Sequence, residues 1–157
     1  MDPVLLATWG LPGLFLAAFL SGSVVPLPSE AVLVALLGGG LAPLPLVTVA
    51  TAGNLLGAAT LFWIGTALSR GAGGALGRAL QRRIQRDPQA FERAQARLRR
   101  FGAPLLLLTW VPIVGDLFVI AAGFVGVRLL PFVIFTGVGK AARFALVASA
   151  TAAALGA

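Results

Sequence analysis

The sequence predicts an all-α integral membrane protein with two inverted repeats, each a re-entrant helical hairpin followed by a transmembrane helix. Three observations predict this fold. The 157 residues are 59% apolar and only 11% charged, against roughly half and a quarter in soluble domains. Several apolar stretches approach the roughly 20 residues that a bilayer helix needs. A break that contains proline and an acid recurs in each half, and we expect residues 1–157 to form a single membrane domain.

The two breaks align without a gap. The first, VPLPSE at residues 25–30, corresponds to VPIVGD at residues 111–116, with an offset of 112 − 26 = 86 for the prolines and 116 − 30 = 86 for the acids. The same offset relates further positions: Gly40 with Gly126, Pro45 with Pro131, and Gly53 with Gly139. We therefore predict repeat one over residues 11–69, a basic linker over 70–101 and repeat two over 102–157.

Each repeat begins with a short apolar run, at about 14–24 or 102–111. At 1.5 Å per residue, such a run covers only about half of a 30 Å hydrocarbon core. A second short run follows the break, and two half-length helices around a polar break are typical of a re-entrant hairpin. The predicted hairpin breaks are Pro26, Pro28, Pro112 and Gly115. The alternative for the first repeat is one kinked helix over residues 11–37.

A helix long enough to cross the membrane follows each hairpin, from Pro45 to about Ser69 and from Pro131 to about Ala154. Proline lies near the first turn of each helix, where its missing N–H matters least. If the hairpins return to their own side and these helices cross, the repeats have opposite orientations. Opposed repeats with broken helices are a recurring design of transporters.

Most of the positive charge is concentrated in the linker, where nine of the twelve basic residues lie between Arg70 and Arg100. The positive-inside rule places residues 70–100 in the cytoplasm and both termini outside it. We expect this linker to contact anionic lipid headgroups. Nucleic acid is not an expected partner, because Phe91 is the only aromatic residue among these arginines before Phe101.

The linker should contain one helix. Asp87 and Pro88 are a favourable helix cap and first position. Four apolar residues then share one face at helical spacing: Phe91, Ala94, Leu98 and Phe101. This helix either lies on the membrane surface or packs only on protein.

Ionisable residues within membrane segments are rare and usually functional, and here they are Glu30, Asp116, Lys140 and Arg143. Both acids begin a returning half-helix, where the helix dipole favours negative charge. They serve either as caps or in handling substrate or protons. Lys140 and Arg143 share a helix face, and an acid is expected to approach them.

Two interpretations of the cations are open. They form structural pairs, or they bind a lipid phosphate together with the half-helix N-termini near Ser29 and Gly115. Ser21 and Asn54 add uncharged polar groups. The predicted substrate- or proton-binding residues are therefore Glu30, Asp116, Lys140, Arg143, Ser29, Asn54 and Ser21.

Cysteine and histidine are absent, which excludes disulfides, thiolate chemistry and most zinc sites. We expect no metal, no cofactor and no enzymatic activity, because no nucleophile and base can be paired. The N-terminus lacks the positive start of a cleaved signal peptide, and we expect it to be retained. A homodimer is the expected oligomer, because a monomer this small would bury little of its polar hairpins.

The motifs that carry a resemblance run from residue 19 to 143. They are FLS at 19–21, Pro26, SE at 29–30, AGN at 52–54, RFGA at 100–103, WVPIVGD at 110–116 and GKAAR at 139–143. Together they resemble the DedA family, the bacterial members of the VTT-domain (SNARE-associated Golgi protein) superfamily, and especially its short YqaA-like branch.

The resemblance implies a multi-pass inner-membrane protein that translocates a phosphate-bearing lipid, polyprenyl-phosphate or phospholipid, with proton coupling in larger relatives. Glu30 matches the family's hairpin acid. An earlier hairpin acid of larger members is Ser21 here, and their second-hairpin arginines are missing around Trp110 and Asp116. Two other classes of function are open: a structural or interaction protein that supports envelope machinery, and a small-ion channel.

Overall fold

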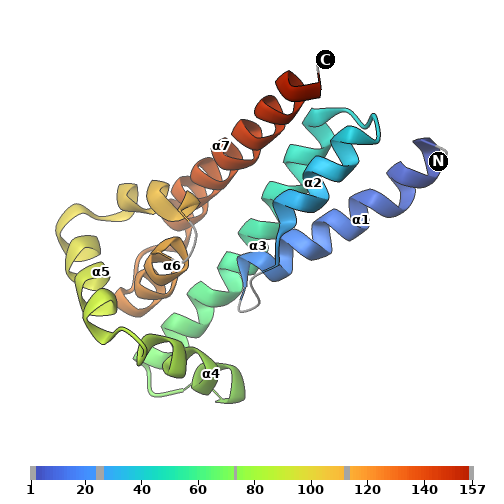
Figure 1. Ribbon diagram of the computed structural model, residues 1–157. Coiled ribbons are helices and arrows are strands. Elements are labelled where there is room, and N and C mark those ends of the chain that lie inside the picture. Colours follow the sequence, from blue (N-terminus) through green and yellow to red (C-terminus); the bar gives the residue numbers. More distant parts are fainter. Residues whose placement is uncertain (1–2, 24–26, 73, 112–113, 156–157) are drawn as a thin grey trace. The chain divides into compact units, whose positions relative to one another are not determined.

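The computed structural model describes residues 3–23, 27–72, 74–111 and 114–155. Within these ranges the regular structure is helical throughout, with no strand (Figure 1). The helices are α1 (Pro3–Gly22), α2 (Ser29–Gly38), α3 (Pro43–Ser69), α4 (Gly74–Ile84), α5 (Pro88–Phe101), the 3-10 helix η1 (Ala103–Trp110), α6 (Val114–Val125) and α7 (Leu129–Leu155). The all-α prediction is confirmed.

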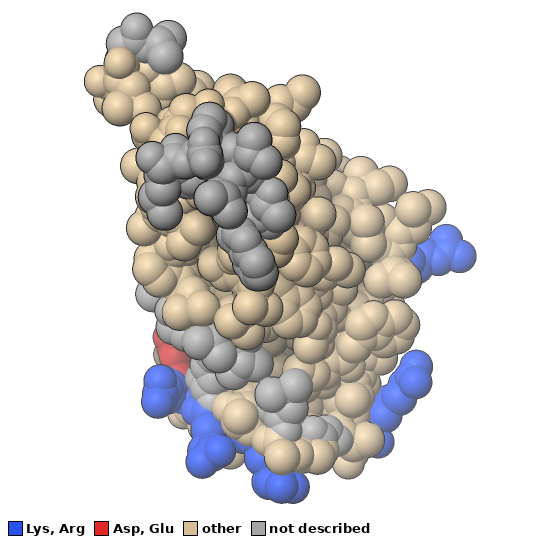
Figure 2. Space-filling view, turned by 90° about the vertical axis from the view of Figure 1, so that its right-hand side faces the viewer, with Lys and Arg blue, Asp and Glu red and all other residues tan. Residues whose placement is uncertain are grey.

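The two predicted crossing helices are α3 and α7. Each has 27 residues, and within the described part of the chain these two are long and apolar enough to cross a membrane by length and composition. Only 39% and 28% of their most apolar windows are buried, whereas the core helix of a soluble protein is mostly buried. Uncharged residues cover most of the face drawn in Figure 2. These features favour helices that lie in lipid.

The first hairpin consists of two packed helices, α1 and α2. Helix α1 ends at Gly22 and α2 begins at Ser29, with Leu27 and Pro28 outside both. The single kinked helix over residues 11–37 is therefore wrong. The predicted start near residue 14 is also wrong, because the helix begins at Pro3. Pro28 caps α2 without a side-chain hydrogen bond, and Pro26 lies outside the described residues.

The second hairpin pairs η1 with α6. Gly115, predicted as a break, instead lies within the first turn of α6 and is buried. A Cβ atom there would lie 2.4 Å from the carbonyl oxygen of Thr109, so the glycine lets the two arms approach. Pro112 lies outside the described residues. The re-entrant path and opposite orientation of the hairpins stay predictions.

The contacts divide the chain into two compact units. The first unit (residues 1–57 and 140–157) holds the first hairpin, the start of α3 and the end of α7. The second unit (residues 58–139) holds the rest of α3, the linker helices, the second hairpin and the start of α7. Each unit has its own buried apolar side chains.

The core of the first unit takes side chains from four helices: Leu14 and Ala18, Leu33, Leu36 and Leu37, Leu46 and Ala50, and Phe144 and Ala148. Close backbone contact joins α1 to α3. A Cβ atom on Gly57 would lie 2.2 Å from the carbonyl oxygen of Phe19, which is too close for any other residue. Small residues at such crossings are typical of membrane helices.

In the second unit, α5 packs on α6 (Figure 1). Phe91, Ala94 and Leu98 are buried, and the ring of Phe91 meets that of Phe124 edge to face at 5.7 Å. Phe101 was expected on this face but is 58% exposed. It ends the helix before Gly102, whose φ is 72°, and the Arg100 guanidinium lies over its ring. Helix α4 was not predicted.

Candidate functional site

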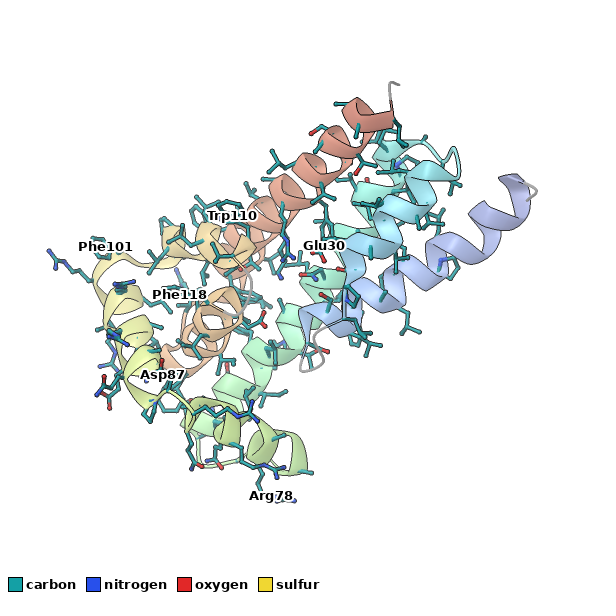
Figure 3. The ribbon with its side chains drawn as sticks, viewed as in Figure 1. Glu30, Arg78, Asp87, Phe101, Trp110 and Phe118 are labelled. Carbon is teal, nitrogen blue, oxygen red and sulfur yellow. The ribbon has the colours of Figure 1, made fainter. Side chains whose placement is uncertain are left out.

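Four of the predicted site residues meet in the first unit, and we call Glu30, Asn54, Lys140 and Arg143 the charge cluster. Glu30 lies in the first turn of α2, where Figure 3 labels it. Asn54 lies in the middle of α3. Lys140 and Arg143 lie on α7, three residues and therefore about one turn apart. Three helices thus position the cluster.

The Arg143 guanidinium donates to the Glu30 carboxylate, and the two groups form an ion pair. Their side chains are 23% and 27% exposed. The prediction that an acid approaches the cations of α7 is therefore confirmed for Glu30. A cation alone in hydrocarbon is unfavourable, and here the carboxylate at the start of α2 neutralises it.

Lys140 and Asn54 form the buried part of the cluster, at 4% and 3% exposure. The Lys140 ammonium donates to the Asn54 amide oxygen. The Asn54 amide nitrogen in turn donates to the carbonyl oxygen of Ala18, at 3.1 Å. This hydrogen-bonded chain ties α7 to α3 and α3 to α1. It joins positions 54 and 140, which the 86-residue offset relates.

Two hydroxyl groups of the first unit are buried and have no hydrogen-bond partner among the described residues. They belong to Ser29, beside Glu30, and to Thr51 on α3. A buried polar group without a partner costs about 1–3 kcal/mol, so such groups in a native protein call for an explanation. A ligand that accepts hydrogen bonds would satisfy a hydroxyl of this kind.

Besides Ser29, two predicted residues are not members of the charge cluster. Asp116 belongs to the second unit, in the first turn of α6 as predicted. Ser21 is half-buried near the end of α1. The contribution of the Ala18 carbonyl had no signal in the sequence, because any residue supplies that acceptor. Within the described ranges, no three acidic, histidine or cysteine side chains come together to hold a metal.

The charge cluster has the chemistry of an anion-binding site in which the Glu30 carboxylate already supplies the negative charge. Arginine binds a phosphate through two parallel N–H donors as well as it binds a carboxylate. A phosphate could therefore take the place of Glu30 on Arg143. Lys140, one turn away, adds a second positive charge.

Comparison with known proteins agrees with the motifs. The model of the VTT domain matches residues 25–153. The chain is 38% identical over 139 residues to "Inner membrane protein YqaA" of Escherichia coli, across 88% of each chain, and equally to that of Shigella flexneri. It is 36% identical over 141 residues to an uncharacterized protein of Haemophilus influenzae, across 83% of this chain and 80% of the relative. No solved structure matches the chain significantly.

These relatives span almost the full length of the chain. The region that the VTT model matches contains all of α3, α7 as far as residue 153 and the whole charge cluster. The chain therefore belongs to the VTT-domain family and is a membrane protein of the DedA type.

Proposed function

We propose that this protein translocates a phosphate-bearing lipid, polyprenyl-phosphate or a phospholipid, across the inner membrane. The observation that carries the proposal is the charge cluster: two cations one turn apart on an apolar helix, with Glu30 as an exchangeable counter-charge. A helix that served only to span the membrane would not need two cations near its middle.

In the proposed cycle, the lipid phosphate replaces the Glu30 carboxylate on Arg143. The buried hydroxyls of Ser29 and Thr51 donate to the phosphate, and the lipid tails stay in the bilayer. Glu30 is the acid that the phosphate displaces, and it is the group through which we propose that transport is coupled to protons. Lys140 holds the buried side of the site through Asn54.

Opposed repeats would give the site access to each side in turn. The contact between Asn54 and Lys140 supports this, because positions related by a two-fold axis meet where the axis passes between them. The name of the Escherichia coli relative supports the inner membrane. We place residues 70–100 in the cytoplasm, both termini outside it, and two copies in the functional assembly.

One observation favours a second function. The partners of the cluster are already in place, Arg143 with Glu30 and Lys140 with Asn54. A protein that only supports other envelope machinery would use the same pairs to hold its helices together. The cluster would then affect function only through folding.

The test measures transbilayer movement of labelled phospholipid and polyprenyl-phosphate in proteoliposomes, with and without a pH gradient. We expect Arg143→Gln and Lys140→Gln to reduce movement by about tenfold or more, since each removes a charge-assisted contact. Arg128→Gln, an exposed arginine outside the cluster, is the matched control and should leave movement unchanged. Folded wild-type protein that moves neither lipid would favour the supporting role, and conductance without lipid movement would favour a channel.

A further inference from the structure

A pocket of about 470 Å³ in the second unit has no role in the proposed transport. One wall comes from the linker and carries Arg86, Arg93 and Arg97; the other is the start of α6, with Val114, Leu117 and Phe118. Its volume is within the range of small-molecule sites. Figure 3 labels Asp87, at the start of the linker wall, and Phe118, on α6. The charge cluster contributes none of the residues that line it.

The linker wall is positively charged. Arg93 and Arg97 are four residues apart on α5 and therefore neighbours on its surface. One acid, Asp87, also lines the pocket, so the formal charge is 3 − 1 = +2. The Asp87 carboxylate accepts the backbone N–H of Ala90 at 2.9 Å. In the described part of the chain, these three arginines make no ion pair.

The opposite wall is apolar and partly open. Val114 is 50% exposed, whereas Phe118 is buried. A small inorganic anion would satisfy the arginines but leave this wall uncovered. A purely apolar ligand would cover the wall but leave the arginines without a counter-charge. The pocket therefore fits an amphiphile with an anionic group at one end.

We propose that this pocket binds one anionic phospholipid from the surrounding membrane. Its headgroup phosphate contacts Arg93 and Arg97, and the first part of its acyl chains lies against Val114 and Leu117. The two walls favour a lipid of the membrane as the ligand, because a basic amphipathic helix here meets an apolar helix that begins at the pocket. Such a boundary between charged and apolar helices is typical of the membrane interface. This bound lipid is separate from any transported one.

The experiment is native mass spectrometry of the full chain released from nanodiscs that contain equal phosphatidylglycerol and phosphatidylcholine. We expect one phosphatidylglycerol per chain to be retained in preference to phosphatidylcholine. Arg93→Gln with Arg97→Gln should reduce that preference by about tenfold or more. Val114→Ser should weaken retention of the lipid, since it makes the apolar wall polar.

The matched control is Arg99→Gln with Arg100→Gln, which removes the same charge from the same helix outside the pocket. Its preference should stay within about twofold of wild type. An equal loss in both double variants, or no preference in the wild type, would overturn the proposal in favour of diffuse attraction. Full competition by sn-glycerol 1-phosphate would overturn it in favour of a site for soluble phosphates. Lys140→Gln should not alter the preference, so failure here is distinguishable from failure of the transport proposal.

Discussion

Glu30 and Arg143 carry opposite charges on two mainly apolar helices. Neither side chain can enter hydrocarbon alone without a large penalty. As a structural pair, they need only to remain opposite in sign. As a binding site, they need the positive charge to stay on α7, where a phosphate can meet Lys140 as well. The two roles therefore respond differently when the charges are exchanged.

We predict that the double variant Glu30→Arg with Arg143→Glu folds but does not move lipid. The exchanged pair restores neutrality, so thermal unfolding in detergent should stay close to that of wild type. The single variants should unfold at lower temperature, because a charge in a membrane segment is unfavourable without its partner. Lipid movement recovered by the exchanged pair would assign the cluster a structural role.

For single residues, the sequence predicted that an ion pair forms with the cations of α7, but it did not predict which acid takes part. An acid had to approach the cations of α7 because charges in lipid need partners. Either Glu30 or Asp116 could meet that requirement, and the contact of Glu30 with Arg143 depends on how α2 and α7 rotate about their axes. The contact of Lys140 with Asn54 also depends on that rotation. No side-chain pattern could indicate that the Ala18 carbonyl completes it.

At the scale of helices, α1 and α3 of the first unit approach each other closely because glycine occupies a contact position. Gly57 contacts the backbone of α1, and a methyl group there would overlap with a carbonyl oxygen that cannot move by itself. Gly13, on α1, has open space where its Cβ would lie. Alanine substitutions at the two glycines therefore distinguish a loss of close packing from the effect of alanine on the helix backbone.

We predict that Gly57→Ala destabilises the protein by about 1–3 kcal/mol, the usual range for overpacking. Gly13→Ala should be neutral or stabilising, because alanine favours a helix over glycine by up to about 1 kcal/mol. Thermal unfolding in detergent, followed by circular dichroism, compares the two. Similar destabilisation by both would mean that α1 and α3 do not approach as described.

A second prediction at this scale concerns the start of α5. Asp87→Ala removes the acceptor for the Ala90 N–H and should destabilise the helix by about 1 kcal/mol. Asp87→Asn should retain most of that stability, since asparagine caps helices equally well. Hydrogen exchange at the first turn of α5 measures the difference. Equal protection in both variants would contradict a capping role.

Length and hydropathy predicted α3 and α7 to within about two residues at each start, because crossing a bilayer sets a minimum apolar length. The cap at Asp87 followed from local chemistry. The position of Phe101 did not, because the turn at Gly102 ends the helical face. Helix α4 was missed because Gly74 and Gly77 lower its helix propensity.

For the whole molecule, the orientation of the helices in the membrane follows from their order and from the linker charge. The predicted path places Ala42, between α2 and α3, outside the cytoplasm. It places Arg78 of the linker inside. Both residues are exposed, and the chain has no cysteine, so a single introduced thiol reports on one position only.

We predict that Ala42→Cys is labelled by a membrane-impermeant maleimide in intact spheroplasts. Arg78→Cys should be labelled only after the membrane is opened, since the positive-inside rule predicts a cytoplasmic linker. Mass spectrometry of the purified protein gives the labelled fraction. The reverse pattern would invert the topology, and labelling of both in intact spheroplasts would contradict a crossing by α3.

The contact between Asn54 and Lys140 also bears on ancestry. If both repeats descend from one duplicated unit, an ancestral pair of identical chains would have placed the same residue opposite itself on the symmetry axis. Two lysines would repel each other there, whereas two asparagines can exchange hydrogen bonds. A lysine opposite an asparagine is accessible only after the copies become independent in one gene. Fusion of the two copies in one gene would thus have allowed a positive charge at a contact where, in a symmetric pair of chains, two identical charges would have repelled each other.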